Sequence, residues 1–276
     1  MSNGVPGSLS TGMRIGIIAG VAAAMTLVVV FFVDPFPQNP GYHCLADDRE
    51  FLGIPHFGDV VSNLAFLLVG IAGLMFVLGP KGQALLNAPG ERLPYVAFFA
   101  ALVLVTFGST YYHWAPSNGP LFWDRLPITI GFMALLAAFV ADRIDLKWGV
   151  RALPVLMILG VAVTYQWLLS EGTGPLACND KGRGDLRFYA LVQAAAVVSI
   201  LLMCWLFPAR NTDIRYVWMM LVFYGIGKAL EFSSVDVWVY DLLGWVSGHT
   251  LKHLVSAVAT YMVLAMLMEK SREDRA

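Results

Sequence analysis

The sequence predicts an all-α membrane protein, folded as a polytopic bundle of transmembrane helices. Hydrophobic residues make up 58% of the 276 residues and charged residues only 13%, against roughly 25% charged in an ordinary soluble domain. The mean hydropathy is +0.68. The apolar residues also fall in continuous blocks of about 20, which is the length of a helix that crosses a bilayer. The strands of a membrane barrel would instead alternate apolar and polar residues.

Eight such blocks follow one another along the chain, separated by short loops rich in Gly, Pro and charge. We place the spans at 14–34, 57–79, 93–113, 122–142, 149–169, 187–207, 215–233 and 246–268. The first block is apolar from Ile15 to Val33, longer than the core of an ordinary signal peptide, and no small-residue cleavage site precedes Asp34. We therefore expect it to be a retained helix.

Basic residues in the loops predict the orientation. With eight spans both termini share one side, and the loops on that side carry eleven basic residues, against five on the other. The eleven are Arg14, Lys81, Arg92, Arg143, Lys147, Arg151, Arg210, Arg215, Lys270, Arg272 and Arg275, and the five are Arg49, Arg125, Lys181, Arg183 and Arg187. This bias predicts cytoplasmic termini. The net charge of -1 gives no indication of a nucleic-acid partner.

Two of the three cysteines, Cys44 and Cys178, fall in predicted outer loops, where an oxidising compartment would allow a disulfide. The alternative is two unrelated thiols. Cys204 lies within an apolar span.

Ionisable residues inside spans are costly, at least ~2.5 kcal/mol each on insertion scales, and usually mark a functional interior. Here they are Asp59, His113, Asp124, Lys228, Glu231, His249, Lys252 and His253. In the predicted topology all of them lie toward the outer ends of five different spans. We therefore expect one polar site in the outer leaflet.

The histidines in this set have metal-ligand spacing. His249 and His253 are four residues apart, which places both imidazoles on one face of a helix, and His113 is the other histidine at a span end. Three imidazoles with an open fourth position are typical of a catalytic zinc site. A pair of interhelical hydrogen bonds or a haem site is the competing interpretation, and we read His43 and His56 as ordinary loop residues.

Two more polar residues accompany His113. Ser109 lies one turn before it on the same face, and Asp124 opens the next span. A serine hydrolase is not favoured, because Ser109 and His113 point in parallel from one helix and no GxSxG turn is present. We expect Ser109 to be a hydrogen-bond donor beside the metal. For Asp124, the alternatives to a catalytic role are an ion pair with Arg125 or the N-cap of the next helix.

Together these residues resemble the alkaline ceramidases, which belong to the wider CREST group of membrane hydrolases. The resemblance rests on Ser109, His113, Asp124 and the His249/His253 pair, and on the segment from Asp59 to Leu64 with its Val-Ser-Asn motif, so it covers roughly residues 42–270.

The resemblance implies a seven-helix core that holds zinc through His113, His249 and His253, with Ser109 and Asp124 as catalytic residues. Residues 41–276 would form this hydrolase domain, and residues 1–40 an additional N-terminal transmembrane helix. The implied substrate is a ceramide-like membrane lipid, cleaved at its amide bond. Asp47, Asp48 and Glu50 loosely echo an acidic segment that binds Ca2+ in animal members. A zinc-containing receptor or lipid-binding protein and a metal or proton transporter are the alternative functions.

Overall fold

The computed structural model describes residues 9–174 and 177–274 of the chain. Arg275, one of the eleven basic residues counted above, and residues 1–8 of the predicted N-terminal segment lie outside the described residues. Helices dominate the described part, in which the only strand-like pairing is an isolated bridge between Phe51 and Ile54. The predicted all-α fold class is confirmed.

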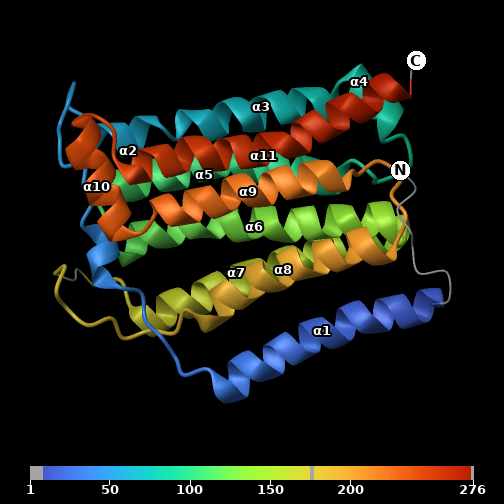
Figure 1. Ribbon diagram of the computed structural model, residues 1–276, viewed down its shortest axis with the longest axis horizontal. Helices are drawn as coiled ribbons and strands as arrows, with labels where there is room; N and C mark the ends of the chain where they lie inside the picture. Colours follow the sequence, from blue (N-terminus) through green and yellow to red (C-terminus); the bar gives the residue numbers. More distant parts are fainter. Residues whose placement is uncertain (1–8, 175–176, 275–276) are drawn as a thin grey trace.

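The helices of the described chain comprise eight long ones and several short connecting ones. In order they are α1 (Thr11–Phe32), the 3-10 helix η1 (Pro40–His43), α2 (Phe57–Val61), α3 (Leu64–Leu78), α4 (Pro80–Leu85), α5 (Leu93–Trp114), α6 (Asn118–Arg143), α7 (Leu146–Glu171), α8 (Arg187–Leu206), α9 (Ile214–Leu230), α10 (Ser233–Leu243) and α11 (Gly248–Glu273). The long helices run side by side as one bundle (Figure 1).

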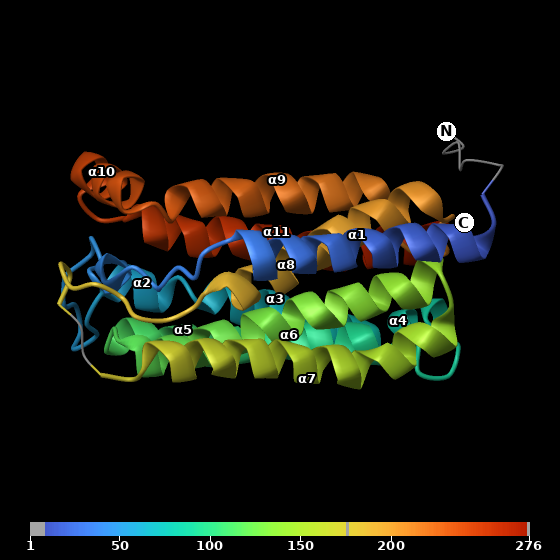
Figure 2. The ribbon, with the colours of Figure 1, turned by 90° about the horizontal axis from the view of Figure 1, so that it is seen from below.

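Seven segments of the described chain are long and apolar enough to cross a membrane: α1, α2 together with α3, α5, α6, α7, α8 and α11. The remaining predicted span is α9, which has 17 residues, at the short end of the ~17–25 that a bilayer crossing takes. It runs along the bundle beside α11 (Figures 1 and 2). The start of α1 and the end of α11 lie at the same end of the bundle, as an even number of crossings requires.

The N-terminal helix α1 stands at the edge of the bundle (Figure 1) and packs along α8. None of its described side chains is buried, so an apolar helix in this position is suited to contact lipid on most of its surface. Two hydrogen bonds secure its ends: Arg14 Nη1 donates to the Leu206 carbonyl at 2.8 Å, and Arg187 Nη1 donates to the Val33 carbonyl at 2.5 Å. The division into two domains at residue 40 stays a prediction.

Glycines on α3 let it approach α5 closely in the core. A Cβ at Gly70 would stand 3.0 Å from the carbonyl oxygen of Phe99, and one at Gly73 would overlap the Phe99 ring itself. The Phe99 side chain is completely buried there. Helix α3 also packs against α11, so it contacts both of the helices that carry the histidines.

The span predicted at 57–79 is interrupted near its start. The chain leaves the α-helical pattern at Ser62 and Asn63, between α2 and α3. The Asn63 side chain replaces lost helical bonds by donating from Nδ2 to the carbonyls of Asp59, at 2.9 Å, and Val60, at 3.3 Å. This break turns the Asp59 and Ser62 side chains toward α11, as their hydrogen bonds below show.

The fourth span begins earlier than its predicted start at residue 122. Helix α6 starts at Asn118, with Ser117 as the extended residue before it. Asp124 therefore lies in the second turn of the helix and is not its N-cap, so that interpretation of the carboxylate is wrong. The reason is that Asn118, Gly119 and Pro120 suggest a loop in sequence, whereas Pro is well tolerated in the first turn of a helix.

Candidate metal centre

Three histidines meet at one end of the bundle. His113 comes from the last turn of α5, and His249 and His253 come from the first two turns of α11. One nitrogen from each ring lies within 4.8 Å of the other two. The ring centroids are 4.7 to 4.9 Å apart and all three side chains are buried. Within the described residues, no other group of His, Cys, Asp or Glu has this arrangement, and the predicted triad is therefore brought together.

A close approach of α5 and α6 sets the position of His113. A Cβ on Gly108 would overlap the carbonyl oxygen of Trp123 and lie 3.2 Å from the Asp124 backbone nitrogen. Pro127, inside α6, has no N–H to donate to the Trp123 carbonyl one turn earlier. Gly108 therefore packs directly against a stretch of α6 backbone in which the Trp123 carbonyl lacks its usual helical hydrogen bond. This contact brings Asp124 beside the turn of α5 that carries Ser109 and His113.

The short helix α10 positions His249 at the start of α11. Asp236 of α10 is buried and its Oδ1 accepts a hydrogen bond from the His249 backbone N–H at 2.7 Å. Gly248 permits this contact, because a Cβ there would lie 2.7 Å from the Asp236 Cα and 2.8 Å from the Leu230 carbonyl oxygen. Ser247 caps the helix by accepting from the Thr250 backbone N–H at 2.9 Å. The first-turn donors of α11 are thus paired, which fixes the helix end.

The hydrogen bonds around His253 leave one ring nitrogen for an ion. Its Nδ1 is 2.8 Å from the Ser62 hydroxyl oxygen, and that hydroxyl lies 3.2 Å from the Asp59 carbonyl, to which it donates its single proton. Ser62 then accepts from the His253 Nδ1–H, and the Asp59 carbonyl also lies beside this ring. The lone pair of His253 is consequently on Nε2, the form of imidazole that binds a metal.

Asp59 ties the broken second span to α11. Its buried Oδ1 accepts from the hydroxyls of Ser247 and Thr250, each at 2.7 Å. These contacts link α2 directly to the start of α11. A second buried atom of interest is His113 Nδ1, which has no hydrogen-bond partner from the described protein atoms. An unpaired imidazole nitrogen in this triad suits a metal-ligand role.

Lys252, Glu231 and Tyr42 form a polar network next to His249. Glu231 pairs with Lys228 at 2.7 Å and with Lys252 at 3.1 Å, while its Oε1 accepts from the Tyr42 hydroxyl at 2.7 Å. The Lys252 Nζ is 2.9 Å from His249 Nε2. An ion bound at that nitrogen would take the lone pair Lys252 uses, and the ammonium would keep Glu231 as its partner.

Asp124 and Ser109, the two predicted catalytic residues, are neighbours on adjacent helices. Both side chains are buried, and the Ser109 hydroxyl lies close enough to the Asp124 carboxylate to interact with it. The alternative partner, Arg125, forms no ion pair with Asp124 and instead donates to the Gln38 side chain. The structure therefore places a carboxylate and a hydroxyl together, one helical turn from His113.

The N-terminal loop before α2 covers this end of the bundle, which sequence patterns did not predict. Tyr42 in η1 lies against His249 and Tyr112, with ring centroids 6.0 Å away in both cases. His43 contacts the Tyr112 hydroxyl at 3.1 Å and Asn118 at 3.0 Å, and burial lowers its pKa. His43 is thus a structural loop residue, as expected.

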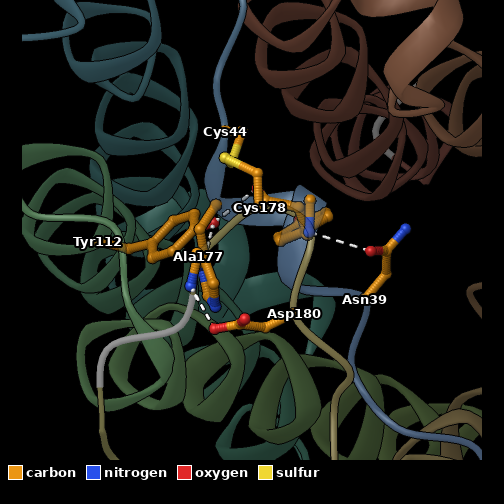
Figure 3. Close-up of a disulfide and its surroundings, with 9 residues drawn as sticks. Asn39, Cys44, Tyr112, Ala177, Cys178 and Asp180 are labelled. Carbon is orange, nitrogen blue, oxygen red and sulfur yellow. Dashed lines mark hydrogen bonds between the residues drawn. A yellow bond between two sulfur atoms is a disulfide. The ribbon is translucent and has the colours of Figure 1, made fainter.

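A disulfide holds the same loop in place. Cys44 and Cys178 are bonded, with their Cα atoms 6.1 Å apart, so the pairing predicted from their loop positions is confirmed. Figure 3 shows the bridge together with one local hydrogen bond in each of the two loop segments that it joins. Asn39 accepts from the Gly41 N–H, and Asp180 accepts from the Ala177 N–H. The bridge fastens the segment containing Tyr42 to the loop between α7 and α8.

The acidic segment considered for Ca2+ is organised around an arginine. Asp47 is buried and accepts from Arg49 Nε and Nη2, at 2.7 and 2.9 Å, and from the Gly58 N–H at 2.8 Å. Burial opposes its ionisation, but these hydrogen bonds outweigh that effect and hold the pKa of Asp47 below its ordinary value. Asp48 and Glu50 do not join Asp47 in any metal-binding group among the described residues. Because Arg49 already supplies the cation, the segment gives a Ca2+ site no support.

Exposed aromatic side chains surround this end of the bundle. Trp114, Trp123, Trp238 and Trp245 are all at least half exposed, as expected for a membrane-interface belt. Trp238 lies on α10, an amphipathic helix that crosses the bundle end (Figure 2), and Trp245 follows shortly after it. The metal centre therefore lies at the interface end of the bundle and not at its middle.

Comparison with known proteins adds no family assignment. No protein-family model matches the chain, and no curated protein sequence matches it. The resemblance to alkaline ceramidases consequently rests on the motif residues alone. What the structure contributes independently is the buried three-histidine group and the side chains gathered around it.

Proposed function

We propose that this protein is a zinc-dependent intramembrane amidohydrolase that cleaves the N-acyl amide bond of a ceramide-like lipid, releasing a free fatty acid and a sphingoid-type amine. The observation that carries the proposal is the convergence of three buried imidazoles, whose nitrogens lie within 4.8 Å of one another, with the Ser109 and Asp124 pair beside them. A protein that only binds zinc needs the three histidines but does not need the Ser109 and Asp124 pair. The alkaline ceramidase resemblance supports the same conclusion.

The donor set fits zinc. Neutral imidazoles are among its preferred ligands, and three of them leave a coordination position for a water or a substrate. The unpaired His113 Nδ1 and the Ser62 contact that leaves Nε2 of His253 free both suit such an ion. Zinc held this way supplies a Lewis acid for the substrate carbonyl and lowers the pKa of its bound water to about 7.

The neighbouring side chains would perform the proton transfers. Asp124 would accept a proton from the attacking water and return it to the leaving amine nitrogen, a role worth typically 10² to 10⁴ in rate. Ser109 would donate from its hydroxyl to the oxygen on which negative charge develops, and loss of one such donor costs roughly 10² to 10³. Ser109 and Asp124 interact with each other in the folded protein, so both groups are already close together before a substrate arrives.

The proposed substrate follows from where the site lies in the bundle. Exposed tryptophans mark this end as interfacial, so the amide of a lipid head group reaches the histidines while its acyl chains stay in the bilayer. The distribution of basic residues supports cytoplasmic termini, with the metal centre on the periplasmic or lumenal side.

Metal content and fatty-acid release, measured together on detergent-purified protein, test the proposal. Wild type, His249→Ala and His56→Asn would be assayed with a panel of N-acyl lipids. His56→Asn is the matched control, because this loop histidine has φ +45°, which Asn tolerates well. We expect zinc and fatty-acid release in wild type and control, and loss of both in His249→Ala. Zinc without release from any lipid would contradict the hydrolase and favour a binding protein, and absence of bound metal would contradict the site.

A further inference from the structure

Two buried hydrogen-bond donors without partners lie next to Asp124. Arg125 on α6 is 7% exposed and Trp167 on α7 is 0% exposed, yet Arg125 Nη1 and Trp167 Nε1 have no partner among the described protein atoms. The Arg125 Cζ stands 4.3 Å from the centre of the Trp167 ring, so the two donors belong to one stacked pair. Buried donors are nearly always satisfied, and two in one place indicate a missing acceptor.

The other buried arginine of α6, Arg143, is an example of a guanidinium with a purely structural role, and its hydrogen bonds can be compared with those of Arg125. Arg143 is 6% exposed and donates to the Thr212 hydroxyl at 2.9 Å and to the carbonyls of Phe207 and Cys204 at 3.0 and 3.3 Å. These hydrogen bonds pair carbonyl groups at the C-terminal end of α8. Arg125 is buried to the same degree, yet its single hydrogen-bond acceptor in the described part of the chain is the Gln38 side chain.

Aromatic rings hold the Arg125 guanidinium while leaving its edge available. Besides Trp167, the rings of Tyr189 and Tyr42 lie 4.9 and 5.8 Å from its Cζ. Cation–π contacts of this kind fix the plane of a guanidinium without using its N–H groups. No carboxylate among the described residues forms an ion pair with Arg125, whose charge acts on the neighbouring Asp124 only without direct contact.

This donor pair is close to the metal centre. The Tyr42 ring that contacts Arg125 also contacts the His249 ring, with centroids 6.0 Å apart, and Arg125 follows Asp124 directly in α6. One aromatic ring therefore separates the guanidinium from a metal-ligand histidine. A lipid with its amide at the histidines would place the polar part of its head group near Arg125.

We propose that Arg125 Nη1 and Trp167 Nε1 form an anion subsite that binds an oxyanion, a phosphate or a carboxylate, carried by the head group of the lipid substrate. The substrate class would then be N-acyl lipids with an acidic head group. The inference rests on the proposed hydrolase function for its substrate, but the subsite itself consists of protein donors that bind an anion whether or not turnover follows. Guanidinium groups are well suited to both kinds of oxyanion.

The first test measures binding without catalysis. Dodecyl phosphate, neutral dodecanol and inorganic phosphate would be titrated into purified wild type, Arg125→Gln, Trp167→Phe and Trp205→Phe, with thermal melting and native mass spectrometry as readouts. Trp205 on α8 is 61% exposed and provides the matched control. Trp167→Phe keeps a six-membered aromatic ring at this position and removes the unpaired N–H donor together with the five-membered ring of the indole.

We expect dodecyl phosphate to bind wild type and the control more tightly than dodecanol or inorganic phosphate does. Losing a hydrogen bond to a charged group weakens binding by roughly tenfold or more, so Trp167→Phe should show about that loss and Arg125→Gln a larger one. The ligand-free Trp167→Phe protein should melt somewhat lower than wild type, because the smaller ring leaves a cavity in the core, so affinity is the deciding readout. Unchanged affinity would overturn the subsite, and equally tight binding of inorganic phosphate would overturn its assignment to a lipid.

A second test separates this inference from the hydrolase itself. Fatty-acid release would be compared for N-acyl lipids that differ only in an acidic or a neutral head group. The ratio of kcat/KM for acidic over neutral lipid should fall about tenfold in Trp167→Phe. Turnover without any preference for the acidic lipid would refute the subsite and leave the hydrolase standing. If dodecyl phosphate binds in a way that depends on Arg125 and Trp167, but no lipid is turned over, the subsite would stand and the hydrolase would be refuted.

Discussion

The hydroxyl of Ser62 should control how tightly His253 binds zinc. Ser62 lies 2.8 Å from His253 Nδ1 and donates to the Asp59 carbonyl, so it holds the imidazole with Nε2 unprotonated. Ser62→Ala removes this partner from a buried ring. Loss of such a supporting contact lowers metal affinity by 10 to 100-fold in other zinc sites. Because the Asp59 carbonyl also lies beside the ring, we expect the low end, about tenfold.

Zinc affinity would be measured on metal-stripped protein by competition with a chelating dye in detergent. Ser199→Ala on α8 is the matched control, since this serine is buried to nearly the same degree and lies on a helix away from the histidines. The control should bind zinc as wild type does. An unchanged affinity in Ser62→Ala would refute the assignment of the ring nitrogens, and an equal loss in both variants would show that the effect is not specific to the site.

Three further predictions follow from the contacts around the centre. Gly108→Ala should destabilise the fold by about 1–3 kcal/mol and reduce fatty-acid release at least 10²-fold by displacing Asp124. Gly131→Ala, whose Cβ meets only Ala101 Cβ at 3.8 Å, should leave melting and release near wild type. The pKa of Asp47 is depressed in the folded protein, so its contribution to stability is complete above the unfolded value of about 3.9 and is lost as the pH falls through the lower folded value. Melting curves should show a drop below about pH 4 that Asp47→Asn lacks. Replacing Cys44 and Cys178, which are 134 residues apart, with Ser should cost about 2–5 kcal/mol, seen as lower melting and as the loss of a reductant-dependent mass shift after alkylation. A wild-type response of Gly108→Ala, of Asp47→Asn or of the cysteine variant would contradict the contact that the variant removes.

The main helices could be predicted because the length and hydropathy of an apolar block are enough to identify a membrane span. The polar residues were predictable for the same reason, since any ionisable group in such a block is conspicuous. The start of α6 was misplaced because Asn118 and Pro120 read as loop residues. The break at Ser62 was missed because one apolar block continues on both sides of it, with only the Asn63 side chain to mark the change.

The supporting residues of the site could not be found by periodicity. Tyr42 reaches His249 from a loop about 200 residues away in the chain, and its position depends on the packing of η1 and not on any local pattern. Asp236 belongs to the 11-residue helix α10, which is too short to stand out between two spans. The cysteine pair was the exception, because loop position and compartment suggested it before the structure showed it.

The most direct test of the account compares Asp124→Asn with wild type, measuring bound zinc and fatty-acid release on the same preparation. The substitution keeps the size of the side chain and removes its capacity to take a proton. Because Asp124 is not a member of the histidine group, we expect one zinc per chain in both proteins and a 10² to 10⁴-fold slower release in the variant. Release at the wild-type rate with zinc retained would contradict the central claim that Asp124 works beside a histidine-bound zinc to hydrolyse an amide.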